Sequence, residues 1–306
     1  MTRCSLYFLI LGVIAGMMHT ACADEPVRHS FFIAGPSFTG IIAEDGSEEW
    51  NAGKAAARDG FVFPNGNVLI AWGDEVKELT RKHDVVFHYT KSAENSEIGT
   101  VQRLENGRTL ITELGKKPRL LEVDADGKIV VDVPLQPETD NAHMQTRMAR
   151  QLANGNYLAT HLLAFKVKEY TPDGKVVQQF ATDLEELGGR AAENWPFTAI
   201  RLANGHTLVN LTHGNKTVEM DAVGKVVWKI SNDDFPDLRP FVDPCGAQRL
   251  PNGNTVICSY ASQEAIKVFE VTPEKKIVWK YTGPHRAHEI QILTTNGTPV
   301  EGLPLK

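Results

Sequence analysis

The dipeptide Asn-Gly occurs six times along the 306-residue chain, each time between alternating apolar runs. The copies lie at 65–66, 106–107, 154–155, 204–205, 252–253 and 296–297. Asn-Gly is the strongest short hairpin signal, because both residues tolerate the positive φ that a two-residue turn requires. The intervals of 41, 48, 50, 48 and 44 residues therefore indicate a repeated unit built from strands.

Four of the copies end nearly identical segments, at 102–107, 151–155, 200–205 and 248–253. The clearest unit spans 196–231, where the pattern predicts strands over 197–202, 207–211, 217–221 and 225–230. A second tight turn, of the Asp-Gly or Val-Gly type, precedes the last strand. A four-stranded antiparallel unit that recurs every 40–50 residues is typical of a β-propeller blade.

The two ends of the chain complement each other. Residues 30–34, 38–43 and 48–50 resemble the second, third and fourth strands of a blade, and residues 289–293 resemble a first strand. We therefore expect an all-β, six-bladed β-propeller of four-stranded antiparallel blades, with the ring closed by pairing N- and C-terminal strands in one blade. The expected domain is residues 24–306.

Residues 1–23 have the pattern of a signal peptide, with Arg3, an apolar stretch over 6–18 and Ala21-Cys22-Ala23 before Asp24. The pattern predicts a secreted or periplasmic protein cleaved after Ala23. His19 stands where a lipoprotein signal has a Leu-like residue, so we do not favour lipidation of Cys22. The apolar stretch is too short for a typical membrane span.

Composition is that of an ordinary soluble protein, with 42% hydrophobic and 23% charged residues and a formal charge of −6. No basic run stands out, so we expect no nucleic-acid partner, and we expect a monomer.

Cys245 and Cys258 flank the turn at 252–253. A two-residue turn would place them diagonally across the hairpin, which favours two free thiols over a disulfide.

In a propeller blade, the turns between the first and second strands and between the third and fourth strands lie on one face. The loops between the second and third strands and the connections between blades lie on the other face. Here the first set is uniformly tight, whereas the connections at 90–99, 134–146, 182–196 and 231–245 are long and varied. Long loops on a rigid scaffold commonly carry binding and catalysis, and the central mouth of that face is the default site.

Polar and aromatic residues concentrate in these loops. We predict as catalytic residues His143, Arg147, His161 and His213. We predict as ligand-binding residues Glu113, Arg119, Trp195, Asn215 and His288. Histidine beside arginine suits an anionic substrate, which the cation holds while the imidazole acts as base or nucleophile. No HExxH or H-x-H pattern is present, and we predict no metal site.

Two segments resemble the tryptophan-docking repeats of quinoprotein-like propellers, namely Glu-Met-Asp-Ala-Val-Gly-Lys-Val-Val-Trp (219–228) and Glu-Val-Thr-Pro-Glu-Lys-Lys-Ile-Val-Trp (270–279). Residues 143–161 resemble the corresponding blade of bacterial arylsulfate sulfotransferases. That resemblance implies an exported six-bladed propeller that transfers a sulfuryl group through a histidine. His143 matches a histidine at the mouth, whereas no histidine occurs at 259–263, where the family's nucleophile is expected.

The leading hypothesis is a pocket for a small anionic or aromatic ligand, with arylsulfotransferase-like group transfer. One alternative is a propeller without enzymatic activity, which docks an extracytoplasmic protein or a polysaccharide. A second is a quinoprotein-type oxidoreductase, although the docking repeats are scaffold and do not by themselves imply a cofactor. Convergence of the histidines on one cavity favours the first hypothesis, and a flat aromatic face favours docking.

Overall fold

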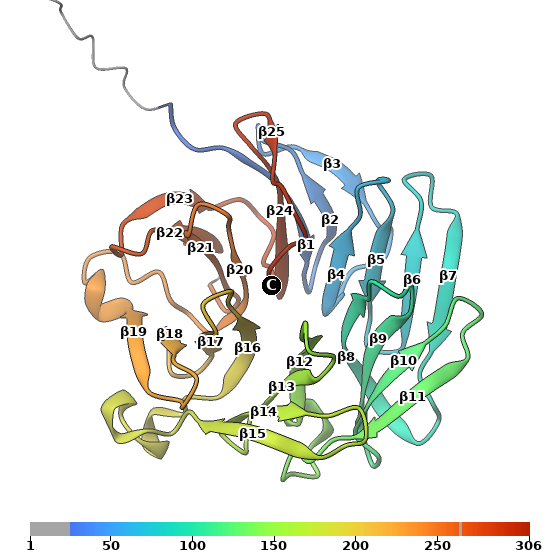
Figure 1. Ribbon diagram of the computed structural model, residues 1–306. Coiled ribbons are helices and arrows are strands. Elements are labelled where there is room, and N and C mark those ends of the chain that lie inside the picture. The colour runs from blue at the N-terminus through green and yellow to red at the C-terminus, as the bar shows by residue number, and fades with distance from the viewer. Residues whose placement is uncertain (1–24, 263–264) are drawn as a thin grey trace, which may run out of the picture.

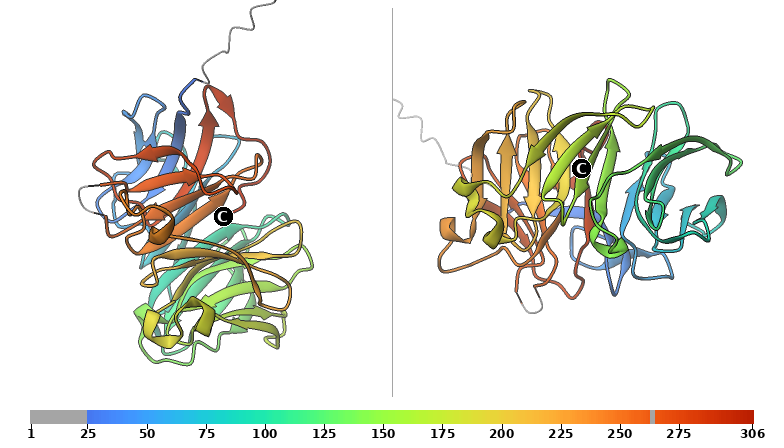
Figure 2. Two further views of the ribbon diagram at one scale, coloured as in Figure 1. Left: turned by 90° about the vertical axis from the view of Figure 1, so that its left-hand side faces the viewer. Right: turned by 90° about the horizontal axis from the view of Figure 1, so that it is seen from below.

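The computed structural model describes residues 25–262 and 265–306. Six antiparallel sheets are arranged around a central axis as a closed ring (Figure 1). Viewed from the side, the ring is a thick disc with loops on both faces (Figure 2). The predicted six-bladed propeller is therefore confirmed. The predicted signal peptide and Cys22 lie outside the described residues.

The first blade joins the two ends of the chain in the order β25-β24-β1-β2-β3. Its strands are β1 (His29–Ala34), β2 (Thr39–Ile42), β3 (Glu48–Asn51), β24 (Glu289–Thr295) and β25 (Thr298–Pro299). β24 forms the first strand of the blade and pairs with β1 from Glu289↔Ala34 to Thr295↔His29. The predicted closure of the ring is confirmed, with β25 as an additional short strand.

The other five blades each contain four consecutive strands. The second has β4 (Asp59–Val62), β5 (Val68–Ala71), β6 (Glu75–Leu79) and β7 (Val85–Thr90). The third has β8 (Asn95–Arg103), β9 (Thr109–Gly115), β10 (Arg119–Val123) and β11 (Ile129–Pro134). The fourth has β12 (Thr146–Gln151), β13 (Tyr157–His161), β14 (Lys166–Tyr170) and β15 (Val176–Ala181).

The fifth blade has β16 (Pro196–Arg201), β17 (Thr207–Leu211), β18 (Lys216–Met220) and β19 (Val226–Ser231). The sixth has β20 (Pro244–Arg249), β21 (Thr255–Ser259), β22 (Val268–Val271) and β23 (Ile277–Tyr281). Short 3-10 helices occur in the connections, as η1 (Ala142–Met144), η2 (Glu185–Leu187), η3 (Arg190–Ala192) and η4 (Asn232–Asp234). Among the described residues, no helix is both long and apolar enough to cross a membrane.

The core consists of apolar clusters between neighbouring blades. Successive side chains of a strand point to opposite faces of its sheet, so Phe31 packs toward the sixth blade and Phe32 toward the second. Trp50 and Trp228 extend this packing, because each donates an indole hydrogen bond to the next blade, at 3.1 Å to Arg81 O and 2.9 Å to Pro273 O. These tryptophans therefore lie between neighbouring blades.

Five of the six repeated turns differ from the two-residue turns that the sequence predicts, whereas the turn at 296–297, between the paired Thr295 and Thr298, has two residues. Of the six asparagines only Asn296 has a positive φ, whereas the glycine is left-handed at every copy. At 250–254 the flanking pair is Leu250 and Asn254, joined at 2.8 Å, which makes a three-residue loop with a left-handed glycine. The asparagine is selected by its side chain, since Asn252 Oδ1 accepts a 2.9 Å hydrogen bond from Asn254 N.

The longer loop changes the register of the hairpin by one residue, so that Ala247 pairs with Ile257. Cys258 therefore lies opposite the bulge in β20 between Pro244 and Ala247. Cys245 and Cys258 are free and buried. Burial raises the pKa of both thiols well above the ordinary value, so both stay protonated and unreactive.

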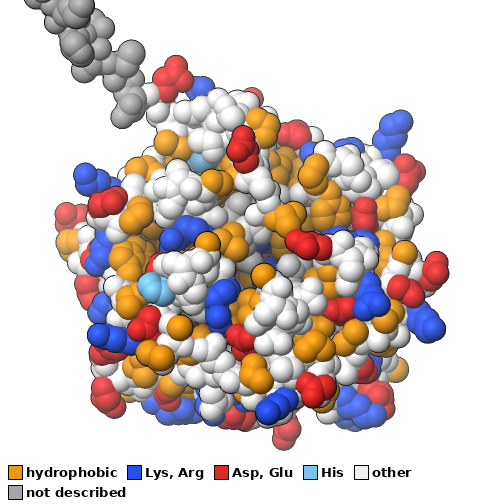
Figure 3. All heavy atoms as spheres, viewed as in Figure 1, with side chains coloured by type: hydrophobic (Ala, Val, Ile, Leu, Met, Phe, Trp, Pro, Cys, Tyr) orange, Lys and Arg blue, Asp and Glu red, His pale blue; other side chains and the backbone are white. Residues whose placement is uncertain are grey.

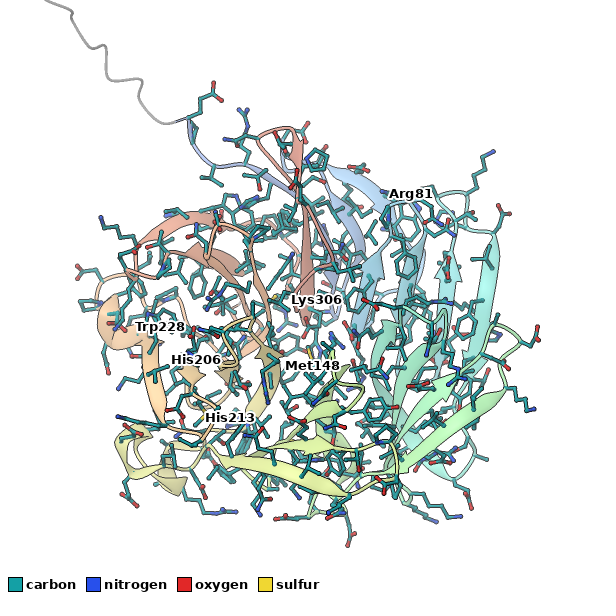
Figure 4. The ribbon with its side chains drawn as sticks, viewed as in Figure 1. Arg81, Met148, His206, His213, Trp228 and Lys306 are labelled. Carbon is teal, nitrogen blue, oxygen red and sulfur yellow. The ribbon has the colours of Figure 1, made fainter. Side chains whose placement is uncertain are left out.

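The two faces of the ring are seen at the ends of β17, where Figure 4 marks His206 and His213. His206 follows the turn at 204–205 and lies on the short-turn face, which Figure 3 shows with charged side chains of both signs around its rim. His213 lies at the other end of β17, on the long-loop face. The candidate site lies on this second face.

Candidate functional site

A cavity of about 310 Å³ lies at the central mouth of the long-loop face. Every blade except the third contributes to its lining, mostly through residues just before or within the first strand. The lining residues are Pro36, Ala56, Ala57, Arg58, His143, Met144, Arg147, Leu162, Trp195, Phe197, Thr212, His213, Asp243, Cys245, Tyr260 and His288. The lining is therefore mixed, with aromatic and apolar side chains around a few charged groups.

Five of the nine residues predicted from the sequence line this cavity. They are His143, Arg147, Trp195, His213 and His288. The other four, His161, Glu113, Arg119 and Asn215, are absent from the lining and have partners elsewhere. The structure thus brings together side chains from the fourth, fifth and first blades that are up to 145 residues apart in the chain.

β-bulges aim three of the lining side chains at the axis. The first strands of the fourth, fifth and sixth blades each shift register near the mouth, between Thr146 and Ala149, Pro196 and Thr198, and Pro244 and Ala247. A bulge changes the direction of a side chain, so that a residue which would point between blades in a regular strand points elsewhere. The bulged segments carry Arg147, Phe197 and Cys245, and all three line the cavity.

On one side of the cavity the lining residues Arg58, His143 and Arg147 gather around Glu97, which does not itself line the cavity. Arg58 Nη2 pairs with Glu97 Oε2. The other oxygen, Oε1, lies 3.4 Å from His143 Nδ1 and 3.7 Å from Arg147 Nη1. Arg147 also donates a hydrogen bond from Nη2 to the backbone oxygen of His143. Two guanidinium groups therefore share one carboxylate, which leaves one positive charge on this wall.

Arg147 is buried, with 5% of its surface exposed. Its buried Nη1 atom makes no hydrogen bond. Burial and the nearby charge of Arg58 lower the pKa of Arg147 to about 10, against the attraction of Glu97, so the group remains charged at neutral pH. A buried, charged donor without a partner costs free energy that a bound anion would recover.

Another part of the lining is aromatic. Trp195 and His213 stack with ring centroids 4.1 Å apart. His213 Nδ1 lies 3.2 Å from Glu193 Oε2, and its Nε2 lies 3.9 Å from Asp243 Oδ1. A planar apolar group of a ligand could pack against this wall, because aromatic surfaces gain from stacked and edge contacts.

His288 lies among aromatic rings. Phe197 and Tyr260 contact it edge-on, with centroids 5.1 and 4.8 Å away. Its Nδ1 atom is buried and makes no hydrogen bond. Burial, together with the charges of Arg147 and Arg58, lowers the pKa of His288 to about 3. His288 is therefore neutral at physiological pH and can offer a ligand a hydrogen bond without adding charge.

His161 lies inside the fourth blade, with no exposed surface. The Thr146 hydroxyl is 2.9 Å from its Nδ1 and the Tyr170 hydroxyl 2.8 Å from its Nε2. Burial and the charge of Lys168 lower the pKa of His161 to about 3. Both ring nitrogens are within hydrogen-bond distance of hydroxyl groups inside the blade. His161 is therefore packed within the blade, away from the cavity.

Glu113 and Arg119 form a buried network in the third blade. Arg119 Nη2 donates to Glu113 Oε2 at 2.9 Å, and Tyr89 donates its hydroxyl to Oε1 at 2.7 Å. Burial opposes ionisation of Glu113, but the hydrogen bonds from Asn95, Ser92 and Tyr89 outweigh it and lower the pKa to about 2. This network joins β9 and β10 to the connection that follows β7.

Asn215 connects two blades without lining the cavity. Its Oδ1 atom accepts a 2.8 Å hydrogen bond from Asp243 N, and its φ of 50° is left-handed. Asn215 therefore supports Asp243, which does line the cavity. This places Asn215 one contact away from the predicted ligand position.

Sequence reasoning did not select Arg58, Glu97, Asp243 or Tyr260. A positional signal exists for two of them, because Arg58, Trp195, Asp243 and His288 each directly precede the first strand of a blade and all four line the cavity. Glu97 lies within β8 and carries no such signal. Among residues 25–262 and 265–306, no group of three or more His, Cys, Asp or Glu side chains is placed to hold a metal ion.

No protein-family model matches the chain, and no curated protein sequence matches it. A crystal structure of a protein of unknown function from Bacteroides caccae is similar, with a TM-score of 0.72 and 18% identity over 90% of this chain and 100% of that one. The comparisons show the fold. Two lyase structures share it at lower similarity.

One is a catalytically inactive histidine-to-alanine variant of virginiamycin B lyase from Staphylococcus aureus with quinupristin. Its TM-score is 0.57, with 14% identity over 83% of this chain and 84% of that chain. The other is a streptogramin B lyase, also at 0.57 and 14%, over 85% of each chain. At such identities the likeness concerns the propeller alone.

Proposed function

We propose that the cavity at the long-loop face binds a small molecule with one anionic group and a planar, largely apolar part. Arg147 holds the anion, and the wall of Trp195 and His213 packs against the planar part. His143 then acts on the bound molecule as base or nucleophile, in an arylsulfotransferase-like group transfer. The observation that carries this proposal is the buried Arg147 Nη1, which has no hydrogen-bond partner beside an exposed histidine.

Charge supports an anionic ligand. Arg58 and Arg147 face only Glu97 on their wall, and opposite charges attract strongly where water is excluded. His143 is suited to the chemical step, because 65% of its side chain is exposed at the cavity. An imidazole that is accessible and flanked by a carboxylate is a common base or nucleophile.

The lyase comparison supports enzyme chemistry on a propeller of this fold. A propeller of similar fold is described as a lyase, and a histidine-to-alanine change makes it catalytically inactive. The shape of the face favours a small ligand over a docked macromolecule, because the mouth is hollowed and not flat. His143 and His213 share the cavity, although His161 does not.

We also propose that the protein is exported and cleaved after Ala23, on the basis of the pattern at residues 1–23. Expression with the native N-terminus, followed by fractionation and N-terminal sequencing, tests this. A mature protein that begins at Asp24 in an extracytoplasmic fraction would agree with the proposal. Retention of residues 1–23 in the cytoplasm would contradict it.

The function is tested with 4-nitrophenyl sulfate as donor and a second phenol as acceptor, following release of 4-nitrophenolate. We expect turnover by the wild type, a loss of about 100-fold or more in His143→Ala, and a smaller loss in His213→Ala, which retains Arg147 and His143. His206→Ala, on the short-turn face, is the control. Absence of turnover, or turnover unaffected by both cavity substitutions, would contradict group transfer at this site.

A further inference from the structure

Glu97 is held in place more firmly than any other carboxylate that contacts a cavity histidine. It lies in an irregular part of β8, between register shifts at Asn95/Glu97 and Ile98/Val101. Its side chain is only 12% exposed. Arg58 pairs with one oxygen and Arg147 lies 3.7 Å from the other, so the carboxylate is fixed between guanidinium groups from two different blades.

His143 is fixed to the same cluster at two points. Its Nδ1 lies 3.4 Å from Glu97 Oε1, an ion-pair contact without a hydrogen bond, and its backbone oxygen accepts a hydrogen bond from Arg147 Nη2. The second contact anchors η1, which carries His143, to the first strand of its blade. The ring therefore has one edge toward Glu97, while Nε2, on the other edge, has no hydrogen bond to a described residue.

Glu97 is ionised at neutral pH. Burial opposes ionisation, but the nearby ring of His143 and the charges of Arg147 and Arg58 outweigh burial and lower the pKa of Glu97. A carboxylate accepts hydrogen bonds but cannot donate them. Nδ1 of a neutral His143 faces this carboxylate at 3.4 Å, which favours the proton on Nδ1 and the lone pair on Nε2.

We propose that Glu97 is the positioning residue of the site, which fixes the tautomer and orientation of His143 so that the Nε2 lone pair faces the bound ligand. This inference rests on the proposed function and names the group that makes His143 competent. Glu97 would also stabilise the imidazolium that forms when Nε2 takes a proton or bonds to the ligand, as carboxylates do beside other acting histidines.

For sulfuryl transfer, the Nε2 lone pair forms a bond to sulfur as the sulfur–oxygen bond to the aryl group breaks. The bonding pair leaves with the phenolate oxygen, and the histidine ring gains one positive charge beside the Glu97 carboxylate. An acceptor phenol then loses its proton to solvent and takes the sulfuryl group, which restores neutral His143. Arg147 contacts the transferred anionic oxygens throughout.

The cavity contains its own comparison pair. His213 Nδ1 forms a 3.2 Å hydrogen bond with Glu193 Oε2, whereas the 3.4 Å contact of His143 with Glu97 is an ion pair without a hydrogen bond. Glu193 has 55% of its side chain exposed, however, and no guanidinium in the described residues pairs with it. Exposed pairs are weak because solvent screens them. Glu193 itself is therefore held less firmly than Glu97, which makes Glu193→Gln the matched control.

The test measures the ring ¹⁵N chemical shifts of the histidines in the full-length mature protein at about pH 9, where imidazoles are neutral. The wild type should show His143 mainly as the Nδ1-protonated tautomer. Glu97→Gln, whose amide can donate as well as accept, should produce a mixture of tautomers or reverse the preference. Glu193→Gln should leave His143 unchanged. A wild type with His143 protonated mainly at Nε2, or a Glu97→Gln variant with an unchanged tautomer, would overturn the inference.

Glu97→Asp covers the case in which Glu97→Gln does not fold. It keeps the negative charge between the two arginines but withdraws the carboxylate by one methylene group, so it should also release the tautomer of His143. With 4-nitrophenyl sulfate, either variant should lose kcat by about tenfold or more, while KM stays similar because Arg147 remains. If the wild type shows no turnover, group transfer fails, and the ¹⁵N spectra still decide whether Glu97 positions His143.

Discussion

Lys306 Nζ lies 3.1 Å from Asp59 Oδ1 at the axis of the ring, although 247 residues separate them in the chain. Figure 4 marks Lys306 near the centre of the ring. Asp59 also pairs with Arg150, whose Nη1 is 2.9 Å from Oδ2, and all three side chains are almost completely buried. Segments from the second blade, the fourth blade and the end of the sequence thus meet through one buried carboxylate.

Asp59→Asn should destabilise the protein strongly, because it leaves Arg150 buried without a counter-charge and leaves Lys306 only Glu289, 3.7 Å from its Nζ. Removal of one partner from a buried ion pair costs about 3–5 kcal/mol. Urea unfolding measures the difference in free energy. Asp74→Asn breaks an exposed pair with Lys54, at 2.9 Å, and should cost under about 1 kcal/mol. Equal effects of the two substitutions would contradict the role given to Asp59.

His161→Phe should affect stability and leave ligand binding intact. The substitution removes the ring nitrogens that contact the hydroxyls of Thr146 and Tyr170, and each buried group left without a partner costs about 1–3 kcal/mol. The affinity for 4-nitrophenyl sulfate should match that of the wild type under conditions in which both are folded. A folded variant that loses affinity or turnover would return His161 to the functional site.

Glu289 should make stability depend on pH near neutrality. Burial, against the attraction of Lys306, raises the pKa of Glu289 to about 7, above the ordinary 4.5. Because the folded-state pKa is raised, the stabilisation is fully present below about pH 4.5 and is lost as the pH rises through 7. The full effect is roughly 3 kcal/mol.

Glu289→Gln removes this dependence. Thr198 Oγ1, 3.2 Å from Glu289 Oε1, and Lys306 Nζ, 3.7 Å from Oε2, face the group, with Asp59 and Arg150 beyond them. We expect the variant to gain stability relative to the wild type between pH 5 and about pH 8, as measured by denaturant unfolding at each pH. A difference that stays constant over this range would contradict the raised pKa.

The fold was predictable because the repeat constrains it at every blade. The left-handed glycine of each tight turn and the alternating apolar residues are local signals, and the termini share a blade because residues 289–293 supply the first strand that residues 30–50 lack. The detailed turn geometry was not predictable from the dipeptide. Asn252 acts through its side-chain oxygen and not through a positive φ, which lengthens the loop by one residue.

The candidate site was predictable in part, for a geometric reason. Loop residues such as His143 and Trp195 could be assigned to a face from the turn pattern, and both line the cavity. His161 lies at the end of a strand, where successive side chains point alternately to the two sides of the sheet. The turn pattern does not show whether such a side chain points to the axis of the ring or into the blade. Glu97 acquires its role only through partners 39 and 50 residues away, Arg58 and Arg147, which no local pattern connects.

The most direct test of the central claim is the affinity for 4-nitrophenyl sulfate, measured by isothermal titration calorimetry on the wild type, Arg147→Gln and Arg190→Gln. Arg190 is the control, because it lies in an exposed pair with Asp183 on the same face. The account predicts measurable binding by the wild type, a Kd raised about tenfold or more in Arg147→Gln through loss of a charged hydrogen bond, and an unchanged Kd in Arg190→Gln. Absence of binding, or equal affinity in all three proteins, would contradict an anion site at Arg147.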